Sequence, residues 1–259
     1  MNVTAPVADA HAVPLDQLDM SDPTRFQNDT IWPFFERLRK EAPVHFCANG
    51  MWGPFWSITR YNDIMTVDTT HQVFSSEPTI TLFEPPKELL MPMFIAMDQP
   101  KHDEQRKAVQ GIVQPPSLAK LEPLIRERVI NILEGLPRNE TFDWVSRVSI
   151  ELTTQMLATL FDFPFEDRKL LTHWSDTATM VIRTPDDLAL REAEMQKCLA
   201  YFVKLWNERV NQPPATNLIS MLAHNPSTQN MGPREYLGNI ILLIVGGNDT
   251  TRNTISSSV

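Results

Sequence analysis

The stretch Pro233–Val259, PREYLGNIILLIVGGNDTTRNTISSSV, decides the fold. Gly232-Pro233 is a favourable helix start, because the N–H that proline lacks would have no helical partner in the first turn. The residues Ile240–Val245 are all apolar, and a helix that is apolar on every side is typically buried. We therefore expect a long central helix from Pro233 to Val259.

A polar sequence, Gly246-Gly247-Asn248-Asp249-Thr250-Thr251, follows the apolar run directly. Two glycines inside a helix cost roughly 1 kcal/mol each relative to alanine, and burial of an acid and of hydroxyl groups is also unfavourable. Such a combination usually serves a functional site. Glycine at 246 and 247 lets a flat ligand approach the backbone, and the Thr250 hydroxyl can reach the Gly246 carbonyl and open the helix. A packing groove for a crossing helix explains the glycines equally well.

Composition and charge exclude several classes of protein. Hydrophobic residues make up 42% of the 259 residues and charged residues 21%, as in ordinary globular proteins. The net charge of -9 disfavours a nucleic-acid partner. The sequence has only two cysteines and starts with no signal-peptide pattern, which favours a cytoplasmic location. No apolar run approaches the roughly 20 residues of a membrane-spanning helix, so no transmembrane anchor is expected.

The chain is predicted to be mainly α with a small β region. Residues 1–22 are small and polar and are expected to form a flexible arm. Val44–Phe46 and Phe55–Thr59 have the pattern of two short strands. Helical periodicity with proline and glycine stops predicts helices at 31–40, 61–68, 101–113, 118–133, 146–160, 166–181, 186–211 and 217–223. The segment Phe74–Asp98 is apolar but has no helical or strand periodicity. It is expected to pack with its apolar side chains turned away from water, because an exposed apolar loop is unfavourable.

Two motifs carry a resemblance to a known family. ILLIVGGNDTTRNT, Ile241–Thr254, resembles the oxygen-binding groove A/G-G-x-D/E-T-T/S in the central helix of cytochrome P-450 enzymes. MDQPKHDEQRKAV, Met97–Val109, is similar to the D-P-P-x-H-x-x-x-R helix of that family, with Gln99 where proline is more usual. The segments YNDIMTVDTTHQVFSSE, ELTTQMLATLFDFP and LWNERVNQPPATNLISML also fit in order. The resemblance covers about Trp32–Val259 and implies that residues 23–259 are the N-terminal portion of a single cytochrome P-450 domain.

The resemblance implies a role for each candidate residue. The cofactor would be haem b, bound through a propionate by two cationic residues one helical turn apart and approached closely by two glycines: His102, Arg106, Gly246 and Gly247. The catalytic residues Asp249 and Thr250 would handle the protons needed to split dioxygen. The substrate would lie against the central helix under a lid formed by residues 79–94, with contacts from Leu82, Phe83, Met93, Phe94, Leu242 and Val245.

The iron ligand of the family is a cysteine in a glycine-rich loop near the C-terminus, and no such loop occurs here. Cys47 lies in FCANGMWG, and Cys198 lies on the apolar side of a predicted helix, where packing is its expected role. Neither matches the ligand, so the metal-binding cysteine is expected beyond Val259. The 259 residues are then an N-terminal fragment that should itself be inactive.

The resemblance also implies a function for the intact enzyme. It would be a class I bacterial monooxygenase that uses O2, with electrons passed from NAD(P)H through ferredoxin reductase and ferredoxin. A basic cluster, Lys101, Arg106 and Lys107, would attract an acidic ferredoxin. The lid most resembles that of the alkane and fatty-acid ω-hydroxylases, so the predicted reaction is terminal hydroxylation of a medium-chain alkane or fatty acid. The alternatives are a terpene or steroid hydroxylase on the same fold and a non-catalytic α-helical binding protein.

Overall fold

Helix α10 (Pro233–Ser256) forms the centre of the C-terminal part of the chain. In the computed structural model, which describes residues 9–87 and 90–259, this helix ends at Ser256 rather than at Val259. Its apolar stretch explains its position, because Ile240 and Ile244 are fully buried. They share one hydrophobic core with side chains from several other helices, among them Leu157, Phe161, Leu171, Trp174, Phe202 and Leu222.

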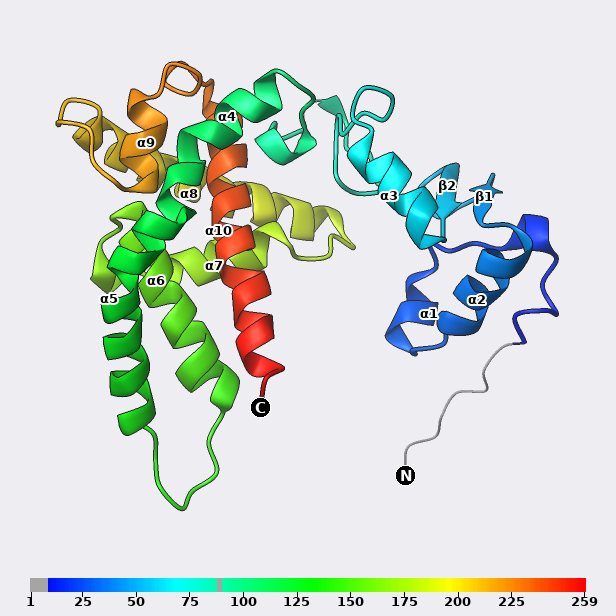
Figure 1. Ribbon diagram of the computed structural model, residues 1–259, viewed down its shortest axis with the longest axis horizontal. Helices are drawn as coiled ribbons and strands as arrows, with labels where there is room; N and C mark the ends of the chain where they lie inside the picture. The colour runs from blue at the N-terminus through cyan, green and yellow to red at the C-terminus, as the bar shows by residue number, and fades with distance from the viewer. Residues whose placement is uncertain (1–8, 88–89) are drawn as a thin grey trace. The chain divides into compact units, whose positions relative to one another are not determined.

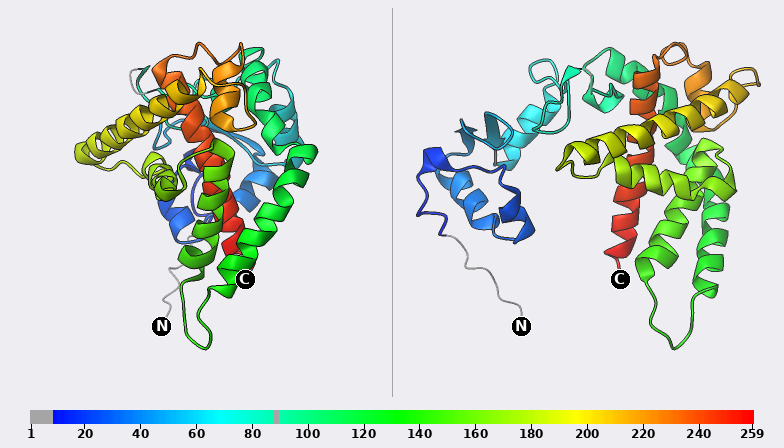
Figure 2. Two further views of the ribbon diagram at one scale, coloured as in Figure 1. Left: turned by 90° about the vertical axis from the view of Figure 1, so that its left-hand side faces the viewer. Right: turned by 180° about the vertical axis from the view of Figure 1, so that it is seen from behind.

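Six further helices surround or support α10: α4 (Lys101–Gln110), α5 (Pro115–Glu134), α6 (Glu151–Phe161), α7 (Lys169–Ala178), α8 (Pro185–Arg209) and α9 (Leu218–His224). Helix α10 packs against α6, α7 and α8, and the views of Figures 1 and 2 show α7 and α8 running across it. Helices α5 and α6 lie side by side and are joined by a loop (Figure 1). No helix in residues 9–87 or 90–259 is long and apolar enough to cross a membrane.

Several predicted helix boundaries differ from the structure. The helix predicted over 101–113 is α4 followed by a 3-10 turn, Gly111–Val113. The helix predicted over 146–160 begins with a π-helical turn, Val145–Ile150, before α6. The helix predicted over 166–181 is a 3-10 turn, Phe165–Asp167, followed by the shorter α7. The start of α8 illustrates a boundary that local chemistry fixes: the Thr184 side chain accepts from the Asp187 N–H, and the Asp187 side chain accepts from the Thr184 N–H, which forms a capping box.

The N-terminal part, up to Leu90 together with Ala96–Asp98, is a compact unit distinct from the unit formed by Met91–Ile95 and Gln99–Val259. It contains α1 (Pro23–Gln27), α2 (Trp32–Glu41), β1 (Val44–Cys47), β2 (Phe55–Ile58) and α3 (Tyr61–Thr69). The two strands pair antiparallel, with Val44 opposite Ile58. The expected fold class, mainly α with a small β region, is confirmed.

Residues 9–22 correct one prediction, because they are packed and not a flexible arm. Leu18 and Met20 are buried in a small core with Phe34 and Leu38 of α2. The guanidinium of Arg37 donates to the carbonyls of Ala10 and Val13 at 2.7 and 2.6 Å. A few apolar side chains and one arginine thus hold a segment whose overall polarity suggested disorder. Residues 1–8 of the predicted arm lie outside the described residues.

Candidate functional site

A cavity of about 420 Å³ lies against α4 and α10 in the C-terminal unit. Its lining is apolar apart from Gln110 and Arg106, and it combines residues that the sequence singled out with others that it did not: Phe94, Arg106, Val109, Gln110, Ile112, Val113, Leu157, Leu160, Leu218, Leu242, Leu243, Gly246 and Gly247. The predicted cofactor and substrate residues Arg106, Gly246, Gly247, Phe94 and Leu242 therefore meet at one site. Large apolar cavities with a few polar groups are typical of ligand sites.

The two glycines of α10 differ in what surrounds them. A Cβ atom at Gly246 would meet nothing within 4 Å, so the helix backbone is open to the cavity there. A Cβ atom at Gly247 would lie 2.7 Å from Leu157 Cδ2 of α6. Gly246 thus leaves room for a flat ligand, whereas Gly247 permits close helix packing. The packing explanation therefore applies to Gly247, and ligand approach at Gly246 stays a prediction.

Helix α4 brings a cation to the cavity wall. Arg106 is exposed and lines the cavity. On the same helix, Lys101 is paired with Glu235 and His102 with Asp103. For Arg106, no ion pair occurs among the residues that the structure describes. A guanidinium stays charged at all ordinary pH values and forms paired hydrogen bonds with carboxylates. The site therefore suits a ligand that is largely apolar and carries an acidic group.

His102 lies beside this wall and already has a partner. Its Nδ1 is 2.9 Å from Asp103 Oδ1, and the hydrogen bond from His102 holds the pKa of Asp103 below its usual value. The imidazole ring is 6.4 Å, centroid to centroid, from the ring of Phe94. Since Nδ1 is engaged by Asp103, the Nε2 atom is the one available to a ligand.

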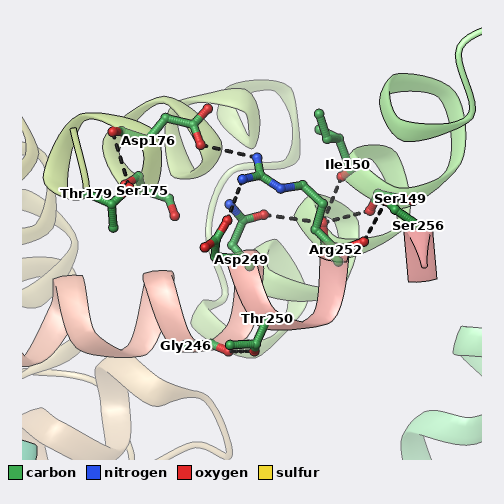
Figure 3. Close-up of polar contacts among 12 residues, drawn as sticks. Ser149, Ile150, Ser175, Asp176, Thr179, Gly246, Asp249, Thr250, Arg252 and Ser256 are labelled. Carbon is green, nitrogen blue, oxygen red and sulfur yellow. Dashed lines mark hydrogen bonds and ion pairs between the residues drawn. The ribbon is translucent and has the colours of Figure 1, made fainter. Parts of the chain in front are cut away.

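Thr250 lies on the same side of α10 as Gly246. Its Oγ1 donates to the Gly246 carbonyl at 2.7 Å (Figure 3), and the side chain is exposed. The helix nevertheless continues without a break from Pro233 to Ser256, so the expected opening at Gly246 does not occur. A hydroxyl can share the carbonyl of the residue four positions earlier without displacing the backbone N–H.

Asp249 points to the other side of α10 (Figure 3) and has different partners. Its Oδ1 accepts from Arg252 at 2.5 Å, and Arg252 also donates to Asp176 of α7 at 3.2 Å. Consecutive residues of a helix are about 100° apart around its axis, which explains the separation of Asp249 from Thr250. Arg252 was missed by sequence reasoning, because its partner on α7 is distant along the chain.

The remaining substrate candidates are spread over both units. Met93 is partly buried, and Val245 packs against the hydrophobic core while Leu243 lines the cavity. Leu82 and Phe83 belong to the N-terminal unit, where each is 48% exposed and Phe83 packs against Trp52. Positions 88–89 of the predicted lid lie outside the described residues. The substrate roles of these side chains and the lid itself stay predictions.

Both cysteine thiols are in surroundings that disfavour the thiolate. Burial and the nearby Asp19 carboxylate raise the pKa of the Cys47 thiol. Cys198 of α8 is fully buried in the hydrophobic core, and burial raises the pKa of its thiol far above the ordinary range. The iron ligand in the cytochrome P-450 pattern is a thiolate, and the surroundings of neither cysteine favour that form.

Known structures and sequences share this architecture. Cytochrome P-450-153 from Novosphingobium aromaticivorans superposes with a TM-score of 0.84 and 39% sequence identity, over 92% of this chain and 61% of that one. Linalool 8-monooxygenase of Pseudomonas putida is 28% identical over 95% of this chain and 64% of its own length. The methyl-branched lipid omega-hydroxylase of Mycobacterium tuberculosis is 27% identical over 98% of this chain and 61% of its own. No protein-family model matches the sequence.

These similarities show that the chain has the fold of the haem-containing monooxygenases. The chain belongs to the cytochrome P-450 superfamily. It spans less than two thirds of the length of the relatives it matches.

The family implies haem, and the described residues fit such a group. The macrocycle is flat and apolar with two carboxylates, and the cavity provides an open backbone at Gly246, apolar walls at Leu242 and Leu243, and the guanidinium of Arg106. A charged group on an apolar wall is stabilised by an opposite charge. A propionate would supply that charge at Arg106.

Proposed function

We propose that the whole protein is a haem-thiolate monooxygenase that hydroxylates a C–H bond of a hydrophobic substrate. It would use O2 and electrons delivered by a ferredoxin and its NAD(P)H-dependent reductase. One observation supports this above all: the apolar cavity joins Arg106, the open backbone at Gly246 and the apolar side chain of Leu242. The bound haem would supply the activation of dioxygen.

Each residue of the site then has a separable task. Arg106 would bind a haem propionate. His102 would bind it in the imidazolium form, through Nε2–H, since its Nδ1–H donates to Asp103. Gly246 would let the macrocycle approach the helix backbone. Thr250, whose hydroxyl is exposed beside Gly246, would hold and pass on a proton. Asp249, held by Arg252 on the other side of the helix, would take part in supplying protons from solvent rather than contact the reacting atoms directly.

The apolar lining supports a hydrocarbon-like substrate and a terminal position of attack. Phe94, Leu242 and Leu243 offer no polar group that would orient a functionalised molecule. We infer that a medium-chain alkane or fatty acid fits this site, hydroxylated at its terminal carbon. The omega-hydroxylase among the relatives supports this class. The linalool monooxygenase supports the alternative of a terpene substrate.

The test is to express the whole protein with haem and supply ferredoxin, reductase and NADPH. Linear alkanes and fatty acids of increasing length would be compared with linalool and a sterol, and the products identified by mass spectrometry. We expect terminal alcohols from the linear substrates as the main products. Preferred turnover of linalool or the sterol would favour the alternatives on the same fold. A whole protein that takes up no haem would favour a non-catalytic binding protein.

A further inference from the structure

A chain of buried amides connects α4, α10 and the backbone beside the cavity. Asn239 of α10 is fully buried. Its Oδ1 accepts from the backbone N–H of Phe94 at 2.9 Å, and its Nδ2 donates to Gln105 Oε1 at 3.0 Å. Gln105 of α4 is 1% exposed and donates in turn to Glu235 Oε1 at 2.5 Å. None of these contacts was expected from the sequence.

The Glu235 carboxylate and the Phe94 N–H stand at the two ends of this series of hydrogen bonds. Together they fix the direction of every hydrogen bond between them. The Glu235 carboxylate is paired with Lys101 at 2.8 Å and only accepts, so the Gln105 NH2 must face it. The Gln105 oxygen then faces Asn239, which must present its own NH2 there. That leaves the Asn239 oxygen for the Phe94 N–H, which only donates. Reversal of either amide would leave buried polar groups without hydrogen-bond partners, which is unfavourable.

The residue next to Asn239 makes a second, independent contact with the same segment. A Cβ atom at Gly238 would lie 2.2 Å from the Pro92 carbonyl oxygen and 2.9 Å from the Pro92 carbonyl carbon. These are backbone atoms, which cannot move away by a change of rotamer. Only glycine at 238 therefore allows the chain to lie so close to α10. Adjacent residues of one helix turn thus hold Pro92 and Phe94.

We propose that Gly238 and Asn239 are positioning residues that fix the segment Met91–Ile95 on α10 and so set the width of the cavity at Phe94. The Phe94 side chain lines the cavity, and its backbone is held by the Asn239 oxygen. Apolar contacts alone would not fix this register, because burial is non-directional whereas a hydrogen bond is directional. A wall fixed in this way favours a slim, unbranched substrate over a branched one. This inference rests on the proposed function.

The first test measures the segment itself, in the whole haem-loaded protein. Asn239→Leu keeps the approximate volume but removes the acceptor of the Phe94 N–H. Hydrogen exchange of a peptide containing Phe94 should become roughly tenfold faster, as expected when a bond worth about 1.4 kcal/mol is lost. The matched control is Asn248→Leu, because Asn248 is also fully buried on α10 but bonds to Thr153. Equal exchange at Phe94 in both variants would overturn the proposal.

The second test uses the direction of the amide chain. Asn239→Asp places a carboxylate oxygen against the Gln105 oxygen, and if Gln105 turns over, its oxygen meets Glu235 instead. Exchange at Phe94 should therefore rise in Asn239→Asp. Adding Glu235→Gln supplies the missing donor, so the double variant should return to near the wild-type rate. If the double variant exchanges as fast as the single variant, Asn239 does not hold Phe94 through this chain.

The third test measures selectivity and separates the two proposals. Wild type, Asn239→Leu and Gly238→Ala would be given a linear alkane and its methyl-branched isomer. The ratio of kcat/KM for linear over branched substrate should fall at least several-fold in both variants, through KM more than kcat. If wild type hydroxylates neither substrate, the proposed function fails while the exchange result still decides whether the segment is held. If wild type is active and the ratio is unchanged, the specificity role is wrong.

Discussion

Thr250 offers the most direct test of the proposed chemistry at the scale of single residues. Thr250→Ala removes a hydroxyl on the cavity side of α10 and leaves the apolar lining intact. We expect substrate affinity to change little, while the fraction of NADPH that yields product falls and hydrogen peroxide rises, because general acid–base groups typically contribute about 10²-fold or more. Product, NADPH and peroxide would be measured together.

Thr250→Ser is the matched variant, since it keeps the hydroxyl and its bond to the Gly246 carbonyl. It should couple NADPH to product nearly as well as wild type. If Thr250→Ala also kept the wild-type ratio of product to NADPH, Thr250 would have no part in proton transfer.

Arg106 tests the haem fit. Its guanidinium lies at the cavity wall, and a charge-assisted hydrogen bond contributes about 1.5 kcal/mol or more. Arg106→Ala should therefore weaken haem binding roughly tenfold, visible as lower haem occupancy after purification and faster haem loss to a scavenger protein. Arg126→Ala is the control, because Arg126 forms an exposed pair with Glu122 on α5, and such pairs contribute little. Equal haem loss from both variants would contradict a propionate contact.

The sequence indicated some of the residues that line the cavity but not Arg252 or Asn239, which act through other elements. Arg106 belongs to a motif on α4, and Leu242 and Gly246 belong to a motif on α10, so each motif can be recognised within one helix. The resemblance, and not the spacing, implied that the two motifs share a site. Arg252 and Asn239 act through partners on other elements. Such contacts depend on how helices pack, and no periodicity within one segment encodes them.

At the scale of elements, the glycine pair of α10 gives a prediction about stability. Gly246→Ala adds a methyl group where nothing lies within 4 Å, whereas Gly247→Ala places one 2.7 Å from Leu157 Cδ2. Both changes gain about 1 kcal/mol of helix propensity, but the second must also displace a core side chain. In the haem-free form, the whole protein with Gly246→Ala should therefore unfold at a higher temperature than the one with Gly247→Ala. Calorimetry would measure both, and the reverse order would show that Gly246 is packed in the whole protein.

Helix positions were predictable because they follow from burial periodicity and from proline and glycine stops. The π-helical turn Val145–Ile150 was not predictable, because its residues have no local signal that distinguishes it from an α-helix. The packing of residues 9–22 was missed for a related reason. Leu18 and Met20 are isolated apolar residues in a polar segment, and only the face of α2 that receives them makes their burial favourable.

At the scale of the whole molecule, charge distribution bears on the redox partner. The chain carries a net charge of -9, yet α4 exposes Arg106 and Lys107 close together. Lys101 of the predicted basic cluster is paired with Glu235 and contributes less net positive charge. Lys107→Glu should slow reduction by an acidic ferredoxin several-fold at low salt without changing substrate affinity, because charges at the rim of an interface act mainly on the association rate. Lys120→Glu, an exposed change on α5, is the comparison in stopped-flow reduction.

Raising the ionic strength should bring wild type and Lys107→Glu together, since salt screens exposed charges. A reduction rate that depends neither on salt nor on Lys107 would place the ferredoxin elsewhere on the protein.

Substrate length tests the cavity as a whole. Each CH₂ group that enters an apolar cavity contributes about 0.8 kcal/mol, or roughly a fourfold gain in affinity. Affinity for a series of linear fatty acids should therefore rise by about this factor per carbon and then level off once the apolar space beside the bound haem is filled. Phe94→Ala removes a ring from the cavity wall that Asn239 holds and so enlarges the cavity. The plateau in affinity should then move to longer chains, without a change in the slope below it. Spectral titration of the haem-loaded protein would give the affinities. Affinity that is independent of chain length, with hydroxylation at internal carbons, would show that the substrate is held by polar contacts outside this cavity.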